Sequence, residues 1–220
     1  MLFSEPPICA EPIDVAFLLD ASGSVGTADF EKQKAFVKAA AGTLALESGM
    51  ANAGSVVYSD VATVQQSFES CNGSKSVMQA IDRMPYYGRT TRIDRALSVA
   101  NTAMFSDKGG CRPYVAKTLV LLTDGRQTPA PDSISMERAV KPLRGKKVAR
   151  LAVGIGNQIS TSELRKVVDE EDDVMTVDSF DDLLSSLHLV SDKICTSAGK
   201  KRFLFCRPSE TLARLHEARK

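Results

Sequence analysis

Three separate stretches of this chain carry small oxygen-bearing side chains that could share a cation. The stretch DVAFLLDASGSVG ends an apolar run with Asp20, Ser22 and Ser24 at alternate positions. A second apolar run, KTLVLLTDG, ends at Asp124. Between them, the loop GRTTRID offers two adjacent threonine hydroxyls. All these donors are oxygens, which are the ligands that hard divalent cations such as Mg²⁺ prefer.

Each stretch taken alone also has a purely structural interpretation. Asp and Ser are common helix caps, so DASGS could simply begin a helix, with Ser24 or Thr27 as its cap. Asp124 followed by glycine is a common turn, and two threonines commonly begin a helix. Only the combination, in this order and at the ends of the expected strands, favours a cation site. Mg²⁺ is the expected cofactor, with Mn²⁺ or Ca²⁺ as alternatives.

The elements that must position these side chains alternate between strands and helices. Only Ser59–Val61 separates the second and third strands, which predicts a hairpin. Helix 134–145 contains Pro142, where we expect a kink or a stop. The pattern predicts an α/β fold, with a Rossmann-like, doubly wound, mostly parallel six-stranded sheet, one antiparallel edge strand and helices on both faces. The predicted order is strand 14–20, helix 28–46, strand 54–60, strand 62–68, helix 74–84, helix 92–105, strand 117–125, helix 134–145, strand 147–156, helix 160–170, strand 173–178 and helix 179–195.

Asp20 and Asp124 fall at the carboxyl ends of predicted parallel strands, which is where open sheets of this kind bind ligands. The motif Asp-x-Ser-x-Ser, a distant Thr and a distant Thr-Asp-Gly resembles the metal-ion-dependent adhesion site of the von Willebrand factor A domain. The resemblance implies that Ser22 and Ser24 bind the metal directly. It implies that Asp20 acts mainly through water and by positioning its loop, and that Asp124 and the Thr bind directly or through water.

The resemblance also chooses between Thr90 and Thr91. The family places its threonine five residues before the small residue of an Ala-Leu or Ala-Ile pair, and Ala96 begins that pair here. Thr91 is therefore the predicted ligand. The chain departs from the family at Asp94, where many members have Gly or Thr, and a role at the helix start is sufficient for it. Residues 47–55 look shortened, which leaves the start of the hairpin open.

The resemblance implies a non-enzymatic, divalent-cation-dependent protein-binding domain of an extracellular matrix or cell-surface protein, with no catalytic residues. Two carboxylates barely neutralise a divalent ion, so an acidic side chain of the partner would complete its shell. The expected partner is an extracellular protein such as collagen or another matrix protein. Side chains near the site that we expect to contact it are Tyr86, Tyr87, Arg89 and Arg126. The alternatives are a disulfide-linked matrix-assembly module with metal-independent binding, and an intracellular complex-assembly subunit.

The cysteines bear on the cellular location. None forms a CxxC pair, which argues against a zinc site. In the implied fold, Cys9 and Cys195 emerge opposite the metal, and so do Cys71 and Cys111. We therefore expect the disulfides Cys9–Cys195 and Cys71–Cys111, with free buried thiols as the alternative. Cys206 is left over, and is either free or bonded to another chain.

A terminal cysteine pair resembles the secreted, matrix type of this family. With a glycosylation sequon at Asn72, it favours an extracellular location. No signal peptide is visible in the N-terminal segment MLFSEPPICAEP.

Composition excludes other classes of function. The formal net charge is +1, so nothing global favours nucleic acid. No apolar run approaches the roughly 18 residues of a membrane span, so we expect no membrane insertion. We expect an N-terminal extension over residues 1–11, a von Willebrand factor A domain over 12–195, and a basic tail over 196–220 that is disordered or starts another module.

Overall fold

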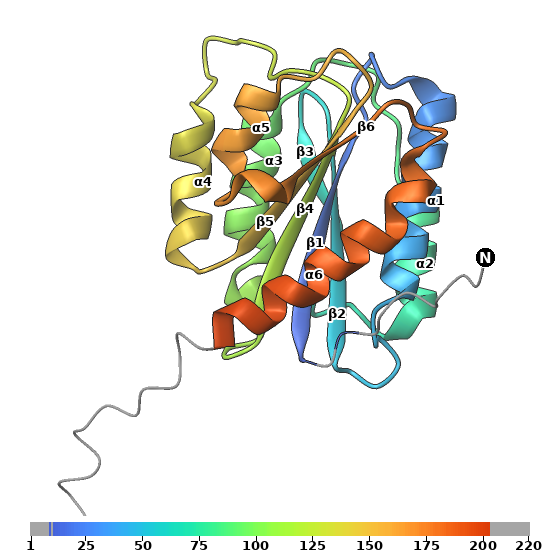
Figure 1. The fold of residues 1–220 in the computed structure, drawn as a ribbon, viewed down its shortest axis with the longest axis vertical. Coiled ribbons are helices and arrows are strands. Elements are labelled where there is room, and N and C mark those ends of the chain that lie inside the picture. Colours follow the sequence, from blue (N-terminus) through green and yellow to red (C-terminus); the bar gives the residue numbers. More distant parts are fainter. Residues whose placement is uncertain (1–8, 10, 203–220) are drawn as a thin grey trace, which may run out of the picture.

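A computed structural model describes residue 9 and residues 11–202, and its centre is a single six-stranded sheet (Figure 1). The strand order is β3-β2-β1-β4-β5-β6. Only β3 runs antiparallel to its neighbour, so the predicted sheet with one antiparallel edge strand is confirmed. The strands are β1 Ile13–Asp20, β2 Ala51–Tyr58, β3 Ala62–Gln66, β4 Ala116–Thr123, β5 Ala149–Ile155 and β6 Val174–Val177.

Helices cover both faces of this sheet, α1, α2 and α6 on one face and α3, α4 and α5 on the other (Figure 1). None of the helices in the described part of the chain is long and apolar enough to cross a membrane. The helices are α1 Gly26–Gly42, α2 Gly73–Asp82, α3 Ile93–Val99, α4 Met136–Gly145, α5 Thr161–Val167 and α6 Leu187–Arg202. Short helical segments lie at Ala100–Met104, Asp107–Gly109, Glu171–Asp173 and Leu183–Ser186.

The apolar run of β1 explains why it lies at the centre of the sheet. All its residues are buried. Side chains alternate between the two faces of a strand, so Val15 and Phe17 join the cluster under α1, α2 and α6. Ala16 and Leu18 join the cluster on the opposite face. A strand that is apolar at nearly every position fits only a sheet covered on both sides.

Several element boundaries differ from the sequence predictions; for example, α1 ends at Gly42 and α6 begins at Leu187. β2 begins at Ala51, three residues early, because it pairs along the full length of β1. α4 contains Pro142 and continues to Gly145, so of the two expected outcomes, a kink or a stop, the stop is wrong and the kink stays a prediction. α6 continues to Arg202, so residues 196–202 are helical rather than part of a tail. The rest of the predicted tail, including Cys206, lies outside the described residues.

One of the two expected disulfides is present. Cys9 and Cys195 are bonded, which links the segment before β1 to α6. Cys71 and Cys111 are both free, so the second expected bridge is wrong for this structure. Cys71 packs against the cluster under α1, α2 and α6, whereas Cys111 packs against the cluster on the other face. The two thiols therefore pack against different clusters, although the segments that carry them are adjacent, since the backbone N–H of Glu69 donates to the carbonyl of Gly109 at 3.0 Å.

Candidate metal centre

The predicted metal ligands gather at the carboxyl ends of the two central strands. Asp20 is the last residue of β1, and Asp124 directly follows β4. These strands are parallel neighbours, and the chain leaves them toward opposite halves of the sheet. That is the switch point where open α/β sheets bind ligands. Thr91 arrives in the loop that precedes α3.

The hydroxyls and one carboxylate face a common space. Ser22 Oγ lies 3.2 Å from Ser24 Oγ, and Ser24 Oγ donates to Asp124 Oδ1 at 2.8 Å. Gly125 lines the same space, because a Cβ atom placed there would lie 3.6 Å from Thr91 Oγ1 and 3.7 Å from Ser24 Oγ. Three segments distant in sequence thus bring their oxygens together.

Asp20 lies behind the Ser22–Ser24 loop and holds it through hydrogen bonds. Its Oδ1 accepts a hydrogen bond from the backbone N–H of Ser22 at 2.9 Å. Its Oδ2 accepts from Thr123 Oγ1 at 2.7 Å and lies 3.4 Å from the hydroxyl of Tyr58. With both oxygens engaged inside the protein, Asp20 fixes the path of the Ser22–Ser24 loop.

The start of α1 is organised by the site rather than by a side-chain cap. Its N-cap residue is Val25, and no side chain caps it, so the predicted cap by Ser24 or Thr27 is wrong. The Ser24 hydroxyl turns toward Asp124 instead. The end of β1 is held from within α1, where Gln33 bonds the backbone N–H of Asp20 at 3.2 Å and its carbonyl at 2.9 Å.

The loop before α3 docks directly on the Ser22–Ser24 loop. The backbone N–H of Gly23 donates to the carbonyl of Arg89 at 2.7 Å. The hydroxyl of Tyr86 donates to the carbonyl of Ser22 at 3.0 Å, and its ring packs against Phe30. Tyr86 therefore supports the site from within the protein.

The four predicted ligand contacts differ in accessibility. Tyr86 and Tyr87 are half-buried, and the hydroxyl of Tyr87 is hydrogen-bonded to Thr63 at 2.8 Å. Arg89 and Arg126 are exposed on the rim of the site. The two arginines are thus the most accessible side chains of this set.

Burial destabilises the charged forms of the two carboxyls. Complete burial, reinforced by the nearby charge of Asp124, raises the pKa of Asp20 to about 6, although hydrogen bonds from Ser22 and Thr123 oppose the rise. Burial also raises the pKa of Asp124, against a hydrogen bond from Ser24. A cation placed between these carboxylates would lower both pKa values.

The donor set fits a small hard cation. Mg²⁺ binds oxygens octahedrally at about 2.0–2.1 Å, which places adjacent ligand oxygens about 3 Å apart. The separations of 3.2 Å (Ser22 to Ser24) and 2.8 Å (Ser24 to Asp124) are close to that value. No group of three or more His, Cys, Asp or Glu side chains in the described residues could hold a metal ion. Hydroxyls must therefore supply part of any metal shell at this site.

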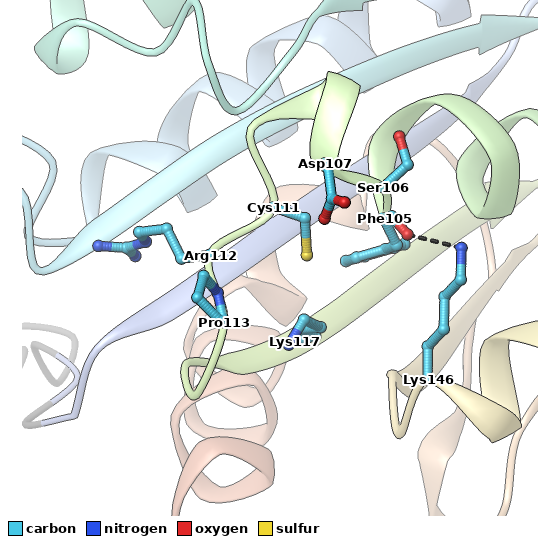
Figure 2. Close-up of a pocket in the computed structure, with 8 residues that line it drawn as sticks. All are labelled: Phe105, Ser106, Asp107, Cys111, Arg112, Pro113, Lys117 and Lys146. Carbon is cyan, nitrogen blue, oxygen red and sulfur yellow. Dashed lines mark hydrogen bonds between the residues drawn. The ribbon is translucent and has the colours of Figure 1, made fainter.

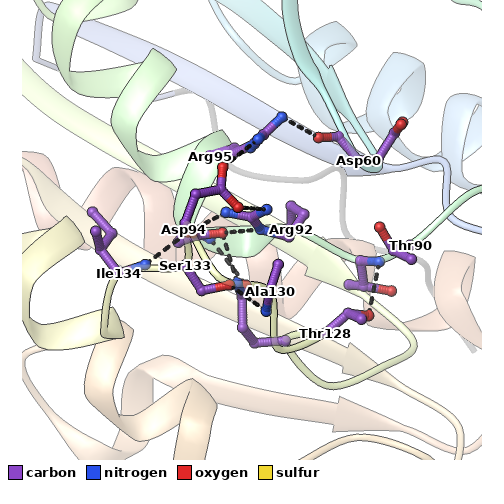
Figure 3. A network of polar contacts seen from close by, with 12 residues as sticks. Asp60, Thr90, Arg92, Asp94, Arg95, Thr128, Ala130, Ser133 and Ile134 are labelled. Carbon is purple, nitrogen blue, oxygen red and sulfur yellow. Dashed lines mark hydrogen bonds and ion pairs between the residues drawn. The ribbon is translucent and has the colours of Figure 1, made fainter.

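A separate ion-pair network lies beside the site (Figure 3). Arg92 and Asp94 are both almost fully buried, and they form two hydrogen bonds of 2.9 Å each. Arg92 also reaches Asp132 at 2.8 Å. Asp94 accepts further bonds from Gln127 Nε2 at 2.6 Å and from the backbone N–H of Ile134 at 3.1 Å. The role at the helix start that we expected for Asp94 is therefore incomplete, because its side chain mainly anchors residues 127–134.

This network holds the Thr91 loop against the loop that follows Asp124. The backbone N–H of Thr91 donates to Thr128 Oγ1 at 3.2 Å, and the N–H of Thr128 donates to the carbonyl of Thr91 at 2.8 Å. Sequence reasoning missed the supporting roles of Gln33, Thr123 and Arg92. Gln33 could have been noticed as a polar residue within the apolar stripe of its helix.

Comparison with known proteins places this fold in a family. Residues 14–188 match the family described as von Willebrand factor type A domain. Collagen alpha-5(VI) chain of Mus musculus is 31% identical over 189 residues, which is 86% of this chain and 7% of that protein. Integrin alpha-X of Mus musculus is 27% identical over 192 residues, which is 84% of this chain and 16% of that protein. The chain thus spans only a small part of these relatives.

Solved structures show the same fold. Proximal thread matrix protein 1 from the mussel byssus superposes with a TM-score of 0.80 at 23% identity, over 85% of this chain and 48% of that one. A second structure of the mussel protein, described as having a zinc-occupied MIDAS motif, superposes with a TM-score of 0.79 over 85% of this chain and 49% of that one.

Proposed function

The chain belongs to the von Willebrand factor type A domain family, and from that premise we propose that it is a non-enzymatic protein-binding domain that depends on a divalent cation. The proposal rests mainly on one observation. Two buried carboxyls with raised pKa values share a small space with three hydroxyls. A cation bound there would offset the free-energy cost of burying both negative charges. Ser22, Ser24, Thr91 and Asp124 would hold the ion.

In this proposal Asp20 has a supporting role. Its two oxygens already accept hydrogen bonds from Ser22 and Thr123, so it would position the loop and contact the ion through water. Mg²⁺ is the proposed ion, and Mn²⁺ or Ca²⁺ would also satisfy oxygen donors. The bound ion would supply an electrophilic centre that accepts one more carboxylate. The finding of zinc in a mussel relative supports a divalent ion in this fold.

The proposed partner is an extracellular protein that presents an acidic side chain. Arg89 and Arg126 lie exposed beside the site and would attract such a group. Collagen or another matrix protein is the proposed class of partner, since collagen VI chains are among the relatives. The Tyr86 and Tyr87 rings would contribute contact area beside the arginines.

We place the domain outside the cell. The Cys9–Cys195 bridge supports this, because disulfides persist mainly in oxidising compartments. Asn72 is exposed, as a glycosylation site must be, and its modification stays a prediction. Titration of the unreduced, denatured protein with a thiol reagent tests the location. Reaction at Cys9 and Cys195 would favour the intracellular alternative.

Calorimetric titration with Mg²⁺ tests the metal site itself. We expect one site in the wild type, and at least about a hundredfold weaker binding in Asp124→Ala and Ser24→Ala, because each loses a direct ligand. Glu137→Gln is the matched control, since it removes an exposed carboxylate on α4. Equal Mg²⁺ binding by Asp124→Ala and wild type would contradict the site.

Partner binding is tested on immobilised collagen and matrix extracts, with Mg²⁺ or with EDTA. We expect binding only with Mg²⁺, and none by Asp20→Ala or Asp124→Ala in either condition. Binding that ignores EDTA but disappears on reduction would instead support the disulfide-linked assembly module.

A further inference from the structure

A second candidate site lies near the start of β4, at the end of the sheet opposite to the proposed metal centre. A cavity of about 460 Å³ opens there, between residues 105–113, the start of β4 and the residue that follows α4 (Figure 2). Its volume is within the range of pockets that hold small ligands or single side chains. The lining residues that matter here are Phe105, Cys111, Arg112, Pro113, Lys117 and Lys146.

The cavity carries positive charge that the protein does not neutralise internally. Arg112 is paired with buried Asp14 at 2.8 Å. The ammonium group of Lys117, by contrast, donates to a backbone carbonyl at 3.3 Å, and that of Lys146 donates to two backbone carbonyls at 2.6 Å each. Carbonyl oxygens orient these cations without cancelling their charge. Asp107 is the one acidic residue in the lining, so the cavity keeps a net positive charge.

The backbone around the cavity is unusual. Tyr114 and Lys147 are the two non-glycine residues with positive φ in the described part of the chain, at 62° and 57°. Tyr114 directly follows lining residue Pro113, and Lys147 directly follows lining residue Lys146. Such conformations are uncommon for non-glycine residues and concentrate at ligand clamps.

An apolar surface adjoins the two cations. Phe105 is buried in the wall, and Pro113 lies at the edge of the cavity. Tyr114 is 97% exposed, the most exposed large apolar side chain in the described residues. A tyrosine held out into solvent beside a pocket is a typical anchor for a protein partner.

We propose that this cavity binds an acidic side chain of a partner peptide, with the carboxylate between Lys117 and Lys146 and the neighbouring apolar group against Pro113 and Tyr114. The two cations match one carboxylate, and of the two Lys117 is half-buried and Lys146 is exposed. Sulfated polysaccharides are instead bound by longer arrays of cations than this pair. The site is distinct from the metal centre, so the domain would have one acidic-ligand site at each end of its sheet.

Cys111 provides a reporter inside the cavity. Its thiol is free and half-buried, and burial raises its pKa, although the charges of Lys117 and Lys146 oppose the rise. Its thiolate attacks one sulfur of an aromatic disulfide, a new S–S bond forms at Cys111, and an aryl thiolate leaves with the electron pair. The rate is followed by absorbance. In a background of Cys71→Ser and Cys206→Ser, Cys111 is the single free thiol to react.

The experiment compares probes of matched size. N-acetyl Phe-Asp amide and N-acetyl Phe-Asn amide are added at about 10 mM, because ligands this small bind at roughly millimolar strength. We expect the acidic dipeptide to slow labelling of Cys111 by a neutral disulfide, dithiodipyridine, at least about threefold, and the neutral dipeptide to leave the rate unchanged. The variant Lys117→Gln with Lys146→Gln should lose this protection, and Lys117→Arg with Lys146→Arg should keep it.

Two further measurements decide the assignment. The first is the ratio of two labelling rates of Cys111, that with the dianionic disulfide dithiobis-nitrobenzoate divided by that with the neutral reagent. This ratio should be higher in the wild type than in the double Gln variant, because the lysines attract the dianion. Equal protection by both dipeptides, or none by either, would overturn the proposal. So would protection by a heparin-derived tetrasaccharide that exceeds protection by the acidic dipeptide. Circular dichroism and urea unfolding of the double Gln variant check that the protein is folded, independently of the metal site.

Discussion

Two pairs of carboxylates lie at the same edge of the sheet, and their surroundings are opposite. Asp20 and Asp124 are bonded to hydroxyls and backbone groups, and burial raises both pKa values. Asp94 and Asp132 are bonded to arginines, and their pKa values are lowered despite the burial of Asp94. The second pair receives its positive charge from the chain itself. The first pair receives no positive charge from the residues bonded to it, so a cation from outside would stabilise it. This difference distinguishes a proposed binding site from an internal support.

The largest expected difference between the pairs is in stability without metal. Asp94→Ala leaves the buried charge of Arg92 with fewer partners, so we expect a loss of about 3–5 kcal/mol in the free energy of unfolding. Asp124→Ala removes a charge whose burial is unfavourable, so its stability in EDTA should equal or exceed that of wild type. Urea unfolding in EDTA measures both.

The control for this comparison is the double variant Asp94→Ala with Arg92→Leu. It removes both charges, and it should recover part of the loss. A metal-free Asp124→Ala that is destabilised as strongly as Asp94→Ala would show that the two pairs do not differ.

The pH dependence of stability should also differ in sign. The pKa of Asp20 rises from 3.8 to about 6 on folding, so the metal-free native state binds its proton more tightly than the unfolded state. Stability should therefore fall by about 3 kcal/mol as pH rises through this window. Asp20→Asn should flatten that fall. The lowered pKa of Asp94 acts oppositely, because its contribution is lost only as pH falls below about 3.8.

Urea unfolding in EDTA between about pH 2 and pH 7 measures both slopes. Other groups titrate in the same range, so each slope is assigned by subtraction of the matching Asn variant from wild type. If the stability of Asp20→Asn depended on pH in the same way as that of wild type, the claim that burial destabilises the charge of Asp20 would be contradicted.

Added Mg²⁺ should stabilise only the protein with an intact first pair. At a concentration of one hundred times Kd, we expect a gain of about 2.7 kcal/mol for wild type. Asp124→Ala should gain nothing, and Glu137→Gln should gain as much as wild type. Thermal unfolding with Mg²⁺ and with EDTA measures the difference, and a rise in Tm for Asp124→Ala would place the ion elsewhere.

The smallest expected effect is the coupling between the two pairs. Asp94 anchors residues 127–134, and Thr128 in turn holds the backbone of Thr91. Asp94→Asn should therefore weaken Mg²⁺ binding by about fivefold, or about 1 kcal/mol. In a Thr91→Ala background the same change should have no further effect on Mg²⁺ binding, although it still lowers stability. Additive losses in the double variant would show that the network acts only on the fold.

Sequence reasoning could locate the candidate site because its residues sit where strands end. Asp20 and Asp124 follow apolar runs, and the βα order alone places both at one edge of the sheet. Contacts that depend on the face of an element could not be found in this way. Cys71 and Cys111 are expected to pair because they lie toward one end, but their side chains pack against different core clusters.

The supporting shell was missed for a related reason. Asp94 was assigned to the helix start, because its partner Gln127 lies 33 positions away in a loop without a pattern. Ser24 was a reasonable helix cap by residue type alone. Its hydroxyl has a stronger acceptor in Asp124, which is 100 positions away and visible only once β1 and β4 are adjacent.

The Cys9–Cys195 bridge also determines how the domain responds to force. It joins two residues that are 186 positions apart in sequence, with Cα atoms only 4.9 Å apart. Tension applied to the chain before Cys9 and after Cys195 would pass through this one covalent bond and bypass the sheet. Stretching would then hardly extend the protein between these two residues. The proposed metal centre would keep its geometry under tension. Reduction of the bond would convert a rigid link into a domain that can be unravelled strand by strand.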